Sequence, residues 1–288
     1  MTYLKVKLKA KAIATRYWMP GTNYLEEIVK AVKGKIRDGD IITVSEKAIS
    51  TATGNIVDES KVKPGKTAYL IAKYWMRIVW GCILCLLARM KPENIRRIRS
   101  YPLVEGACHK QTIIQYSGAL QALNVWSENG IDGSNLPYAY VSLPLKNAKE
   151  IAQKIREHIR HKLGKKTAVI IVDTDKTYSF RNFHFSCRPC TVKGIFYTKC
   201  FLAYVLGRFL KLKQRATPVA AAGLDLDAEN LLRIADFSNR LRGFGAGRTV
   251  WDMAEAFSTC LTGVSWEMLN QVEHRPIVMI RIVKESTL

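Results

Sequence analysis

The chain contains the stretch AVIIVDTD at residues 168–175, in which five apolar residues run directly into two aspartates separated by a threonine. An uninterrupted, largely β-branched run of this length is typical of a strand that is buried on both faces of a sheet. The stretch therefore predicts a buried strand that stops at Asp173 and leaves Asp173, Thr174 and Asp175 where the sheet meets solvent.

The acidic end of this strand is the first candidate for a functional site. Asp173 and Asp175 would project to the same side if the strand continued, with the Thr174 hydroxyl between them. Oxygen ligands of this kind suit Mg²⁺ or Mn²⁺ held against phosphate groups. The alternative is an ordinary strand terminator in which the aspartates bond to nearby backbone groups.

Patterns on both sides of this strand predict further regular elements. Strands are expected at residues 4–8, 41–44 and 276–283, and helices at 24–32, 68–90, 147–163, 198–211 and 249–261. Because strands and helices mix without a regular βαβ rhythm, the sequence predicts an α+β (irregular α/β) fold with mixed sheets. We expect one domain over residues 1–288, with a helical excursion at about 66–105.

Residues 68–90 are the most apolar part of the chain, but Lys73 and Arg77 interrupt them. Their longest uncharged run, residues 78–88, is about half a membrane span, so we expect a buried helix and no membrane partner. The first nine residues lack the apolar core of a signal peptide, and seven cysteines are too few for a disulfide scaffold. A cytoplasmic protein is predicted.

Basic residues dominate the charge balance. Lys and Arg number 45 against 24 Asp and Glu, which gives a net charge of +21. Such a charge attracts polyanions but does not fix the fold or the chemistry, so nucleic acid, nucleotide phosphates and substrates with many carboxylates all fit. The basic residues are spread along the chain and form no long block of like charge.

A second polar motif, NGIDGSN at residues 129–135, presents a carboxylate, a hydroxyl and an amide from a glycine-flanked turn. Such a loop can supply a third metal oxygen and hydrogen bonds to phosphate, although a simple turn explains the same residues.

Together these motifs resemble the gamma-glutamyl ligases that extend the glutamate tail of the deazaflavin coenzyme F420. The resemblance rests on residues 39–50 (GDIITVSEKAIS), 129–135, 168–175 and the pair Phe180-Arg181. It implies the gamma-glutamyl ligase fold, an intertwined homodimer, and joining of L-glutamate to a carboxylate of the coenzyme with GTP and two divalent cations. A carboxylate needs a good leaving group before an amine can attack it, so an acyl phosphate is the expected intermediate.

The resemblance also assigns site residues. Asp132, Asp173 and Thr174 fall on the family's metal positions; Ser45, Glu46 and Asn135 fall on its nucleotide contacts; Met19 and Pro20 fall near the base. The chain also departs from the family at Asn182-Phe183 and by an extra residue between Asp173 and Phe180, and two further departures concern site positions. Thr51 stands where a phosphate-pairing lysine is usual, so Lys47 is the expected substitute, and Val264 stands at a late metal ligand, for which Glu267 or Gln271 would have to serve.

Other features have weaker interpretations. His184, Cys187, Cys190 and Cys200 have spacing compatible with zinc. The resemblance, however, places them along a strand of the ligase core, where alternate residues face opposite ways and would not all reach one ion. The stretch RGFGAGR at residues 242–248 is either a flexible turn or a lid over a nucleotide. A rival to the ligase hypothesis is a non-catalytic relative that uses its charge to bind RNA.

Overall fold

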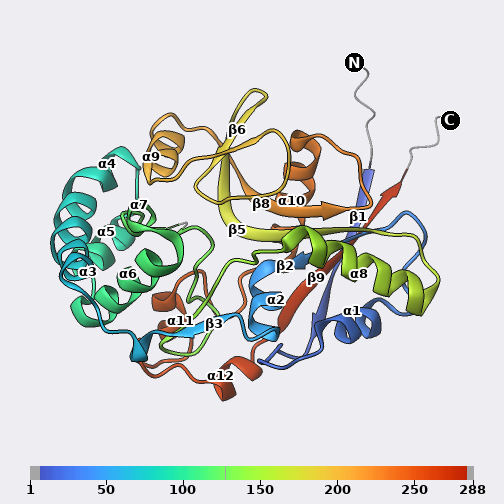
Figure 1. Ribbon diagram of the computed structural model, residues 1–288, viewed down its shortest axis with the longest axis horizontal. Coiled ribbons are helices and arrows are strands. Elements are labelled where there is room, and N and C mark those ends of the chain that lie inside the picture. The colour runs from blue at the N-terminus through green and yellow to red at the C-terminus, as the bar shows by residue number, and fades with distance from the viewer. Residues whose placement is uncertain (1–6, 127, 284–288) are drawn as a thin grey trace.

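The computed structural model describes residues 7–126 and 128–283, and within them a mixed sheet forms the centre of the protein (Figure 1). Its strands lie in the order β1-β9-β2-β5-β6-β7, and β8 pairs with β5. Their bounds are β1 (Lys7–Thr15), β2 (Ile41–Ser45), β5 (Ala168–Phe180), β6 (Phe183–Ser186), β7 (Ile195–Tyr197), β8 (Lys213–Ala222) and β9 (His274–Val283). β2 and β5 run parallel while β9 and β8 run antiparallel beside them, which confirms the predicted mixed fold.

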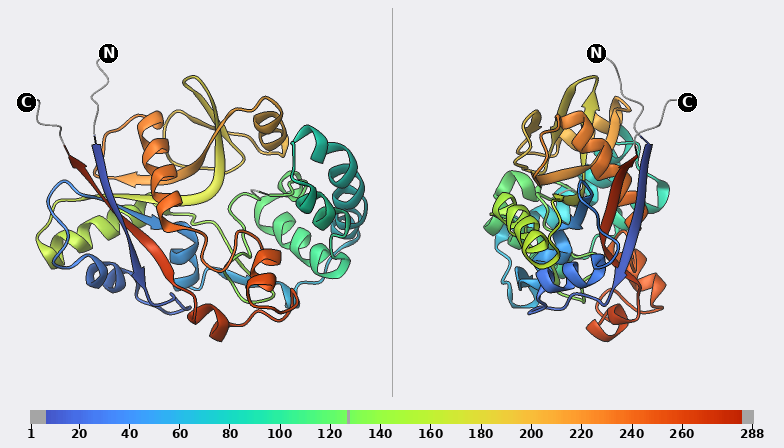
Figure 2. Two further views of the ribbon diagram at one scale, coloured as in Figure 1. Left: turned by 180° about the vertical axis from the view of Figure 1, so that it is seen from behind. Right: turned by 90° about the vertical axis from the view of Figure 1, so that its right-hand side faces the viewer.

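Helices cover both faces of this sheet, as Figure 2 shows from two further sides. On one face, α1 (Tyr24–Val32), α2 (Glu46–Ala52) and α8 (Ala148–Leu163) pack against Val169 and Ile171. On the other, α10 (Ala228–Arg242) packs against Ile170 and Val172. Alternate residues of this strand therefore enter two different cores. Because both faces are buried, no polar residues alternate with the apolar ones in the run at residues 168–172.

The strand β5 does not stop at Asp173, and this corrects the sequence-based expectation. It continues to Phe180, but its register with β8 slips: Asp173 pairs with Thr217, whereas Lys176 pairs with the preceding residue, Ala216. Thr174 and Asp175 are therefore extra residues in a β-bulge. The Thr217 hydroxyl donates to the Asp175 carbonyl over 2.7 Å, so a backbone group displaced by the bulge keeps a partner.

A group of helices lies at one end of the sheet (Figure 1). It comprises α3 (Lys66–Leu70), the π-helical η2 (Ile71–Leu84), α4 (Cys85–Leu87), α5 (Pro92–Arg99), α6 (Leu103–Ser117), α7 (Ala119–Ala122) and α9 (Leu202–Phe209). Met76, Trp80, Ile98 and Ile113 are fully buried in their shared core. The short strands β3 (Ile56–Asp58) and β4 (Tyr140–Ser142) and the turn η1 (Glu59–Lys61) connect this group to the sheet.

The first three of these helices form one continuous rod, and its exposure corrects a second expectation. Lys66–Leu87 is the one helix of the described residues that is long and apolar enough to cross a membrane by length and composition, yet only 33% of its most apolar window is buried. Met76 and Trp80 fill the core, but Ile78, Ile83 and Leu86 are 52%, 56% and 67% exposed. The predicted buried helix is therefore buried on one side alone.

The remaining predicted elements differ mainly in length. The helix expected at residues 249–261 is α11 (Val250–Ala256), which begins with a capping box formed by Thr249 and Asp252. A further short helix, α12 (Trp266–Asn270), precedes β9. The first predicted strand begins among described residues at Lys7, so Leu4 and Val6 of that prediction lie outside them.

Candidate active site

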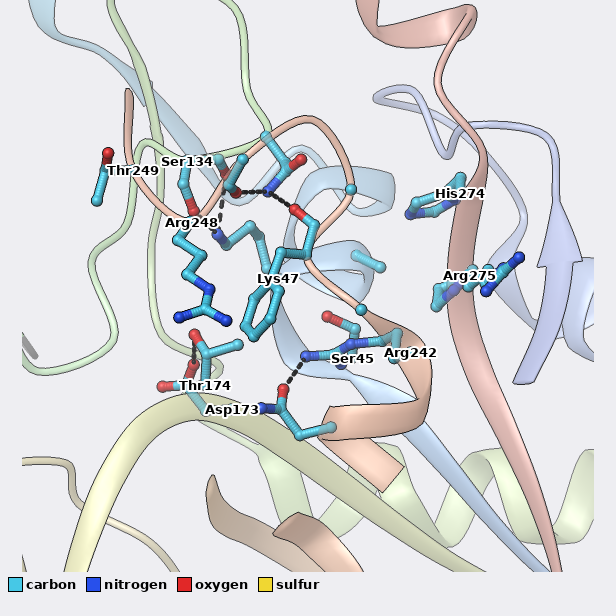
Figure 3. Close-up of a pocket in the computed structure, with 18 of the residues that line it drawn as sticks. Ser45, Lys47, Ser134, Asp173, Thr174, Arg242, Arg248, Thr249, His274 and Arg275 are labelled. Atoms are coloured by element: carbon cyan, nitrogen blue, oxygen red, sulfur yellow. Dashed lines mark hydrogen bonds between the residues drawn. The ribbon is translucent and has the colours of Figure 1, made fainter. Parts of the chain in front are cut away.

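Segments that are distant in the sequence enclose a cavity of about 410 Å³, and four of them supply most of its polar lining residues. They are the junction of β2 and α2, the bulge of β5, the turn at residues 129–135, and the chain from the end of α10 to the start of β9 (Figure 3). The lining cations are Lys47, Lys176, Arg242, Arg248 and Arg275, and the lining acids are Asp173, Asp175 and Glu273. The excess of positive charge suits a polyphosphate.

Lys47 reaches into the cavity from the first turn of α2 (Figure 3). Its ammonium group forms an ion pair with Asp132 and donates to the Ser134 carbonyl over 2.9 Å and to the Ser134 hydroxyl over 2.6 Å. One helical turn later, Thr51 also lines the cavity, and its hydroxyl donates to the Lys47 carbonyl. Lys47 thus supplies positive charge in the part of the cavity where Thr51 replaces the expected lysine.

Asp132 is held by its own turn as well as by Lys47. The Ser134 N–H donates to one carboxylate oxygen over 2.7 Å, and the Ser134 hydroxyl donates to the other over 3.1 Å. The turn is shaped by left-handed backbone at Asn129, Gly130 and Asn135. The Asp132 carboxylate is therefore an internal acceptor that stabilises the turn in this structure.

Arg188 is the buried centre of the site, and nothing in the sequence singled it out. Its side chain is 2% exposed; it forms an ion pair with Glu46, donates to Asp173 over 3.0 Å, and donates to the Asn129 carbonyl over 3.0 Å. Burial opposes its charge, but the carboxylates of Glu46 and Asp173 raise the pKa of Arg188 above its usual value. One guanidinium thereby joins α2, β5 and the turn at residues 129–135.

The packing around Arg188 explains why residue 130 is glycine and shows that Glu46, a predicted nucleotide contact, lies outside the cavity lining. At Gly130 an added Cβ would lie 2.6 Å from the Arg188 Nε, and the φ angle is +84°, so glycine satisfies both demands. Glu46 does not line the cavity: it is 3% exposed and also accepts from the Leu145 N–H over 2.8 Å. Glu46 therefore holds Arg188 in place behind the residues that line the cavity.

Asn135 lines the cavity and holds the glycine-rich stretch at residues 242–248 against it. Its amide donates to the carbonyls of Phe244 and Gly247 over 3.0 and 2.9 Å, and its side-chain oxygen accepts from the Ala246 N–H over 2.7 Å. At Gly245 an added Cβ would lie 2.4 Å from that oxygen. These contacts make the stretch an ordered wall of the cavity.

Aromatic residues form the side of the cavity next to β9. Tyr17 and Trp18 line it together with His274, whose ring lies 4.9 Å from that of Tyr17 and 5.8 Å from that of Trp18. Burial lowers the pKa of His274 to about 4, so the imidazole is neutral at physiological pH. Met19 and Pro20 follow directly but are not among the lining residues.

The bulge of β5 supplies the oxygen atoms best placed for a cation. Asp173, Thr174 and Asp175 all line the cavity, and the Gly130 N–H donates to an Asp175 carboxylate oxygen over 3.1 Å. This donor set fits Mg²⁺, which commonly binds one or two carboxylates together with substrate phosphates and water. Among residues 7–126 and 128–283 there is no group of three or more Asp, Glu, His or Cys residues placed to hold a metal ion.

Several weaker candidates can now be placed. His184 contacts the Ser179 hydroxyl over 2.9 Å, and the Cys187 thiol donates to the Cys200 carbonyl, so the structure does not support the zinc alternative. Val264 is buried in a small apolar cluster. Glu267 and Gln271, its suggested substitutes, are exposed and line neither of the two cavities described here.

A second cavity of about 500 Å³ adjoins the first. Both are lined by Trp126, Ser134, Thr174, Asp175, Arg248 and Thr249. The second cavity has the more apolar walls, which include Tyr101, Tyr138, Val141 and Trp251. The two spaces therefore meet at the polar residues of the bulge and of Arg248.

Charged residues are buried at the far side of the second cavity. His109 lies between Glu59, at 2.9 Å, and Glu128, at 2.7 Å, and Lys110 forms an ion pair with Glu128. Burial opposes the imidazolium, but the two carboxylates outweigh it and raise the pKa of His109 to about 10. The cluster ties α6 to η1.

This cluster predicts a pH dependence of stability. Because the folded pKa of His109 is raised from 6.5 to about 10, its stabilising contribution is complete below pH 6.5 and is lost as the pH rises through 10. The difference in unfolding free energy between wild type and His109→Gln should therefore shrink over that range, which denaturant titrations at several pH values would measure. A difference that stays constant would contradict the pairing.

Sequence comparison places the chain among known proteins. Residues 12–199 match the family described as F420-0:Gamma-glutamyl ligase. An uncharacterized protein of Methanocaldococcus jannaschii is 36% identical over 290 residues, covering 96% of this chain and 98% of that protein. The coenzyme F420:L-glutamate ligase of the same organism is 30% identical over 139 residues, covering 48% of this chain and 49% of that enzyme. This chain belongs to the F420-0:Gamma-glutamyl ligase family.

Proposed function

We propose that this protein is a GTP- and divalent-metal-dependent ligase that forms a glutamyl amide bond on coenzyme F420 or a related polyanionic acceptor. Family membership supports a ligase of this type. The observation that carries the proposal furthest is the meeting of the two cavities at Ser134, Thr174, Asp175 and Arg248. A phosphate donor in one space and an acceptor carboxylate in the other would then face each other.

The first cavity suits the nucleotide. Lys47 lines it from α2, and Arg242 and Arg248 line it from the stretch at residues 242–248, so positive charge from two segments can neutralise phosphate oxygens. Tyr17, Trp18 and His274 provide an aromatic wall for a base at the opposite side. Asp173, Thr174 and Asp175 would hold Mg²⁺ or Mn²⁺, which would supply charge stabilisation to the transferring phosphoryl group.

The second cavity suits the acceptor, because its apolar walls can bury a ring system while its polar end meets the first cavity. Transfer of the γ-phosphoryl group to the acceptor carboxylate would give an acyl phosphate. The amine of L-glutamate would then attack the acyl carbon and release phosphate. In this scheme Arg248 orients oxygen atoms at the junction, and no nucleophilic side chain is needed.

The ion pair of Asp132 bears on the proposed number of cations. The resemblance implies two ions, and Asp132 falls on a metal position, but the structure pairs this carboxylate with Lys47. We propose that one cation binds at the bulge of β5 and that Lys47 provides the second positive charge. The homodimer and the cytoplasmic location implied by the resemblance and the composition stay predictions.

A phosphate-release assay tests the ligase directly. Incubation with GTP, Mn²⁺ and L-glutamate should release phosphate only when an acceptor carboxylate such as coenzyme F420 lacking glutamate is added. Replacing GTP with ATP tests the choice of nucleotide in the same assay. No release with any acceptor of this class would reject the proposal.

Replacing Lys47 with alanine should weaken GTP binding by about 10- to 100-fold, since a charged hydrogen bond to phosphate contributes about 1.5–3 kcal/mol. Isothermal titration calorimetry would measure the affinity. Lys149→Ala is the matched control, because Lys149 is exposed on α8 and lies outside the cavity. An unchanged affinity in the Lys47 variant would show that this residue is not the phosphate contact.

RNA binding is the alternative function, favoured by the net charge of +21 and by the basic outer face of α8. Binding that depends on phosphate contacts weakens steeply with salt. An electrophoretic mobility assay over a range of salt concentrations would measure this dependence. Affinity no better than about millimolar at physiological salt would eliminate the alternative.

A further inference from the structure

The outer side of the helix Lys66–Leu87 presents a row of apolar side chains to solvent. Leu70, Tyr74, Ile78, Ile83 and Leu86 are 55%, 47%, 52%, 56% and 67% exposed. They follow one another at intervals of three to five residues, and because Ile71–Leu84 is a π-helix, whose turn is longer than that of an α-helix, this spacing keeps them on one side. Exposed apolar side chains gathered in this way mark an interaction surface.

The same kind of surface continues on α9. Leu206, Phe209 and Leu210 are 47%, 48% and 58% exposed. Arg208 joins α9 to the end of the long helix, because its guanidinium donates to the carbonyls of Ala88 and Arg89. Figures 1 and 2 show the long helix at the outer edge of the molecule, at the end away from β1 and β9. The buried side of α9 packs on β5 through Gly207, and its Tyr204 lines the first cavity. We call these eight residues the apolar face.

The apolar face arises from segments that contain no acidic residue. There is no Asp or Glu between residues 60 and 92, nor between residues 176 and 224. Lys66, Lys73, Arg89 and Lys91 are exposed along or beside the long helix, and Lys211 is exposed just after α9. A surface that combines apolar side chains with an excess of positive charge is complementary to anionic lipid head groups.

The opposite side of the long helix is fixed in the protein, so the helix lies on its surface. Met76 and Trp80 are fully buried, and the indole N–H groups of Trp75 and Trp80 both donate to the Leu123 carbonyl over 2.8 Å. The Arg77 guanidinium donates a hydrogen bond to the Tyr101 carbonyl over 2.8 Å. Crossing a bilayer would break these contacts, whereas adsorption on a bilayer would bury only the side that is already exposed.

We propose that the apolar face adsorbs to the surface of an anionic lipid bilayer, in a monotopic manner. The prediction of no membrane partner rests on the short uncharged run at residues 78–88. That run argues against a helix that spans the membrane, but it does not argue against adsorption on the membrane surface. A second copy of the chain is a less suitable occupant. Self-association through the apolar face would bring two surfaces with an excess of basic residues together, and juxtaposed like charges cost several kcal/mol.

The location of the apolar face links it to the proposed chemistry. The helices α5 and α6 pack against the buried side of η2, and α6 carries His109 on the wall of the second cavity. Adsorption would therefore hold the acceptor side of the enzyme close to the bilayer. This inference does not depend on the ligase reaction, and vesicle binding can be measured without any substrate.

The test is co-sedimentation of the full chain with vesicles. We expect binding to phosphatidylcholine vesicles that contain about 30% phosphatidylglycerol, weaker binding as salt rises, and little binding to phosphatidylcholine alone. The double variant Ile78→Ser/Leu86→Ser should lose at least about tenfold in partitioning, and Lys73→Glu should lose binding mainly at low salt. Circular dichroism and thermal unfolding would verify that the variants are folded.

Ile282→Ser is the matched control, because Ile282 is 44% exposed on β9 and lies outside the apolar face. This variant should bind as the wild type does. Equal binding to neutral and anionic vesicles, no binding to either, or equal losses in the control and the double variant would overturn the proposal. Sedimentation velocity provides one further check: a dimer that the double variant dissociates would assign the apolar face to a second copy and reject the lipid surface.

Discussion

Replacing Arg188 with methionine is expected to lower the free energy of unfolding by about 3–5 kcal/mol, the usual loss when one partner of a buried ion pair is removed. Arg188 is 2% exposed and contacts both Glu46 and Asp173. Methionine fills much of the same volume, so the loss would come mainly from two buried carboxylates that no longer contact the guanidinium. Chemical denaturation of wild type and variant at neutral pH would measure it.

The pH dependence of this loss separates charge from packing. Burial raises the pKa of Glu46. Arg188 lowers that pKa, so its removal should raise the pKa of Glu46 further. A carboxylate whose folded pKa is raised destabilises the folded state above that pKa, so the deficit of the variant should shrink as the pH falls through the pKa of Glu46 in the variant. Arg188→Lys is the matched variant: it keeps the charge, loses the planar guanidinium that contacts Glu46, Asp173 and the Asn129 carbonyl at once, and should be less destabilised. A deficit that is independent of pH would attribute the effect to packing.

Replacing Asp173 with asparagine is expected to lower ligase turnover at least about 100-fold, because a carboxylate that binds a catalytic cation supplies several kcal/mol of transition-state stabilisation. The asparagine oxygen can still accept the hydrogen bond from Arg188, which retains Glu46, so the unfolding free energy should stay within about 2 kcal/mol of wild type. Steady-state phosphate release and denaturant titration would measure the two quantities.

Binding of Mn²⁺ provides a second readout for the same variant. In the presence of nucleotide, Asp173→Asn should bind Mn²⁺ more weakly, as followed by electron paramagnetic resonance of the free ion. Asp225→Asn is the control, since Asp225 is exposed in the connection before α10 and lines neither cavity. Turnover near the wild-type value in the Asp173 variant would contradict its assignment to the catalytic centre.

The central strand could be predicted from its sequence because burial leaves a simple pattern. Residues 168–172 enter two cores in alternation, and a strand covered on both faces needs apolar residues at every position. The helix at residues 24–32 was likewise predictable from its asparagine cap and its apolar spacing, and the structure gives the same bounds. In both elements the pattern of apolar residues in the sequence matches their burial in the folded protein.

The bulge that shapes the site was not predictable, because its cause lies in the partner strand. Thr174 and Asp175 become extra residues only through the register with β8. That partner has alanines and Pro218 in place of a β-branched pattern, so β8 itself gave no signal. The polar residues alone suggested that the strand ends at Asp173. Pairing with β8 instead makes Thr174 and Asp175 a bulge within a longer strand.

Arg188 was missed for a related reason. It lies between Cys187 and Pro189, in a segment whose cysteines drew attention to zinc. No spacing rule connects it to Glu46, which is 142 residues earlier. Only the folded chain brings these charges together, whereas Lys47 and Asp173 could be singled out because each adjoins a recognisable strand end.

The contacts of Asn135 have a thermodynamic consequence for ligand association. Its side chain makes three hydrogen bonds to the backbone of residues 244–247, so one amide immobilises the rim of the cavity. The conformational entropy of that rim is therefore lost during folding, so ordering the rim adds no further entropy cost to the binding of a nucleotide. Association with the wild type should accordingly be fast and require little rearrangement of the rim, and loosening the amide should make the entropy of association less favourable.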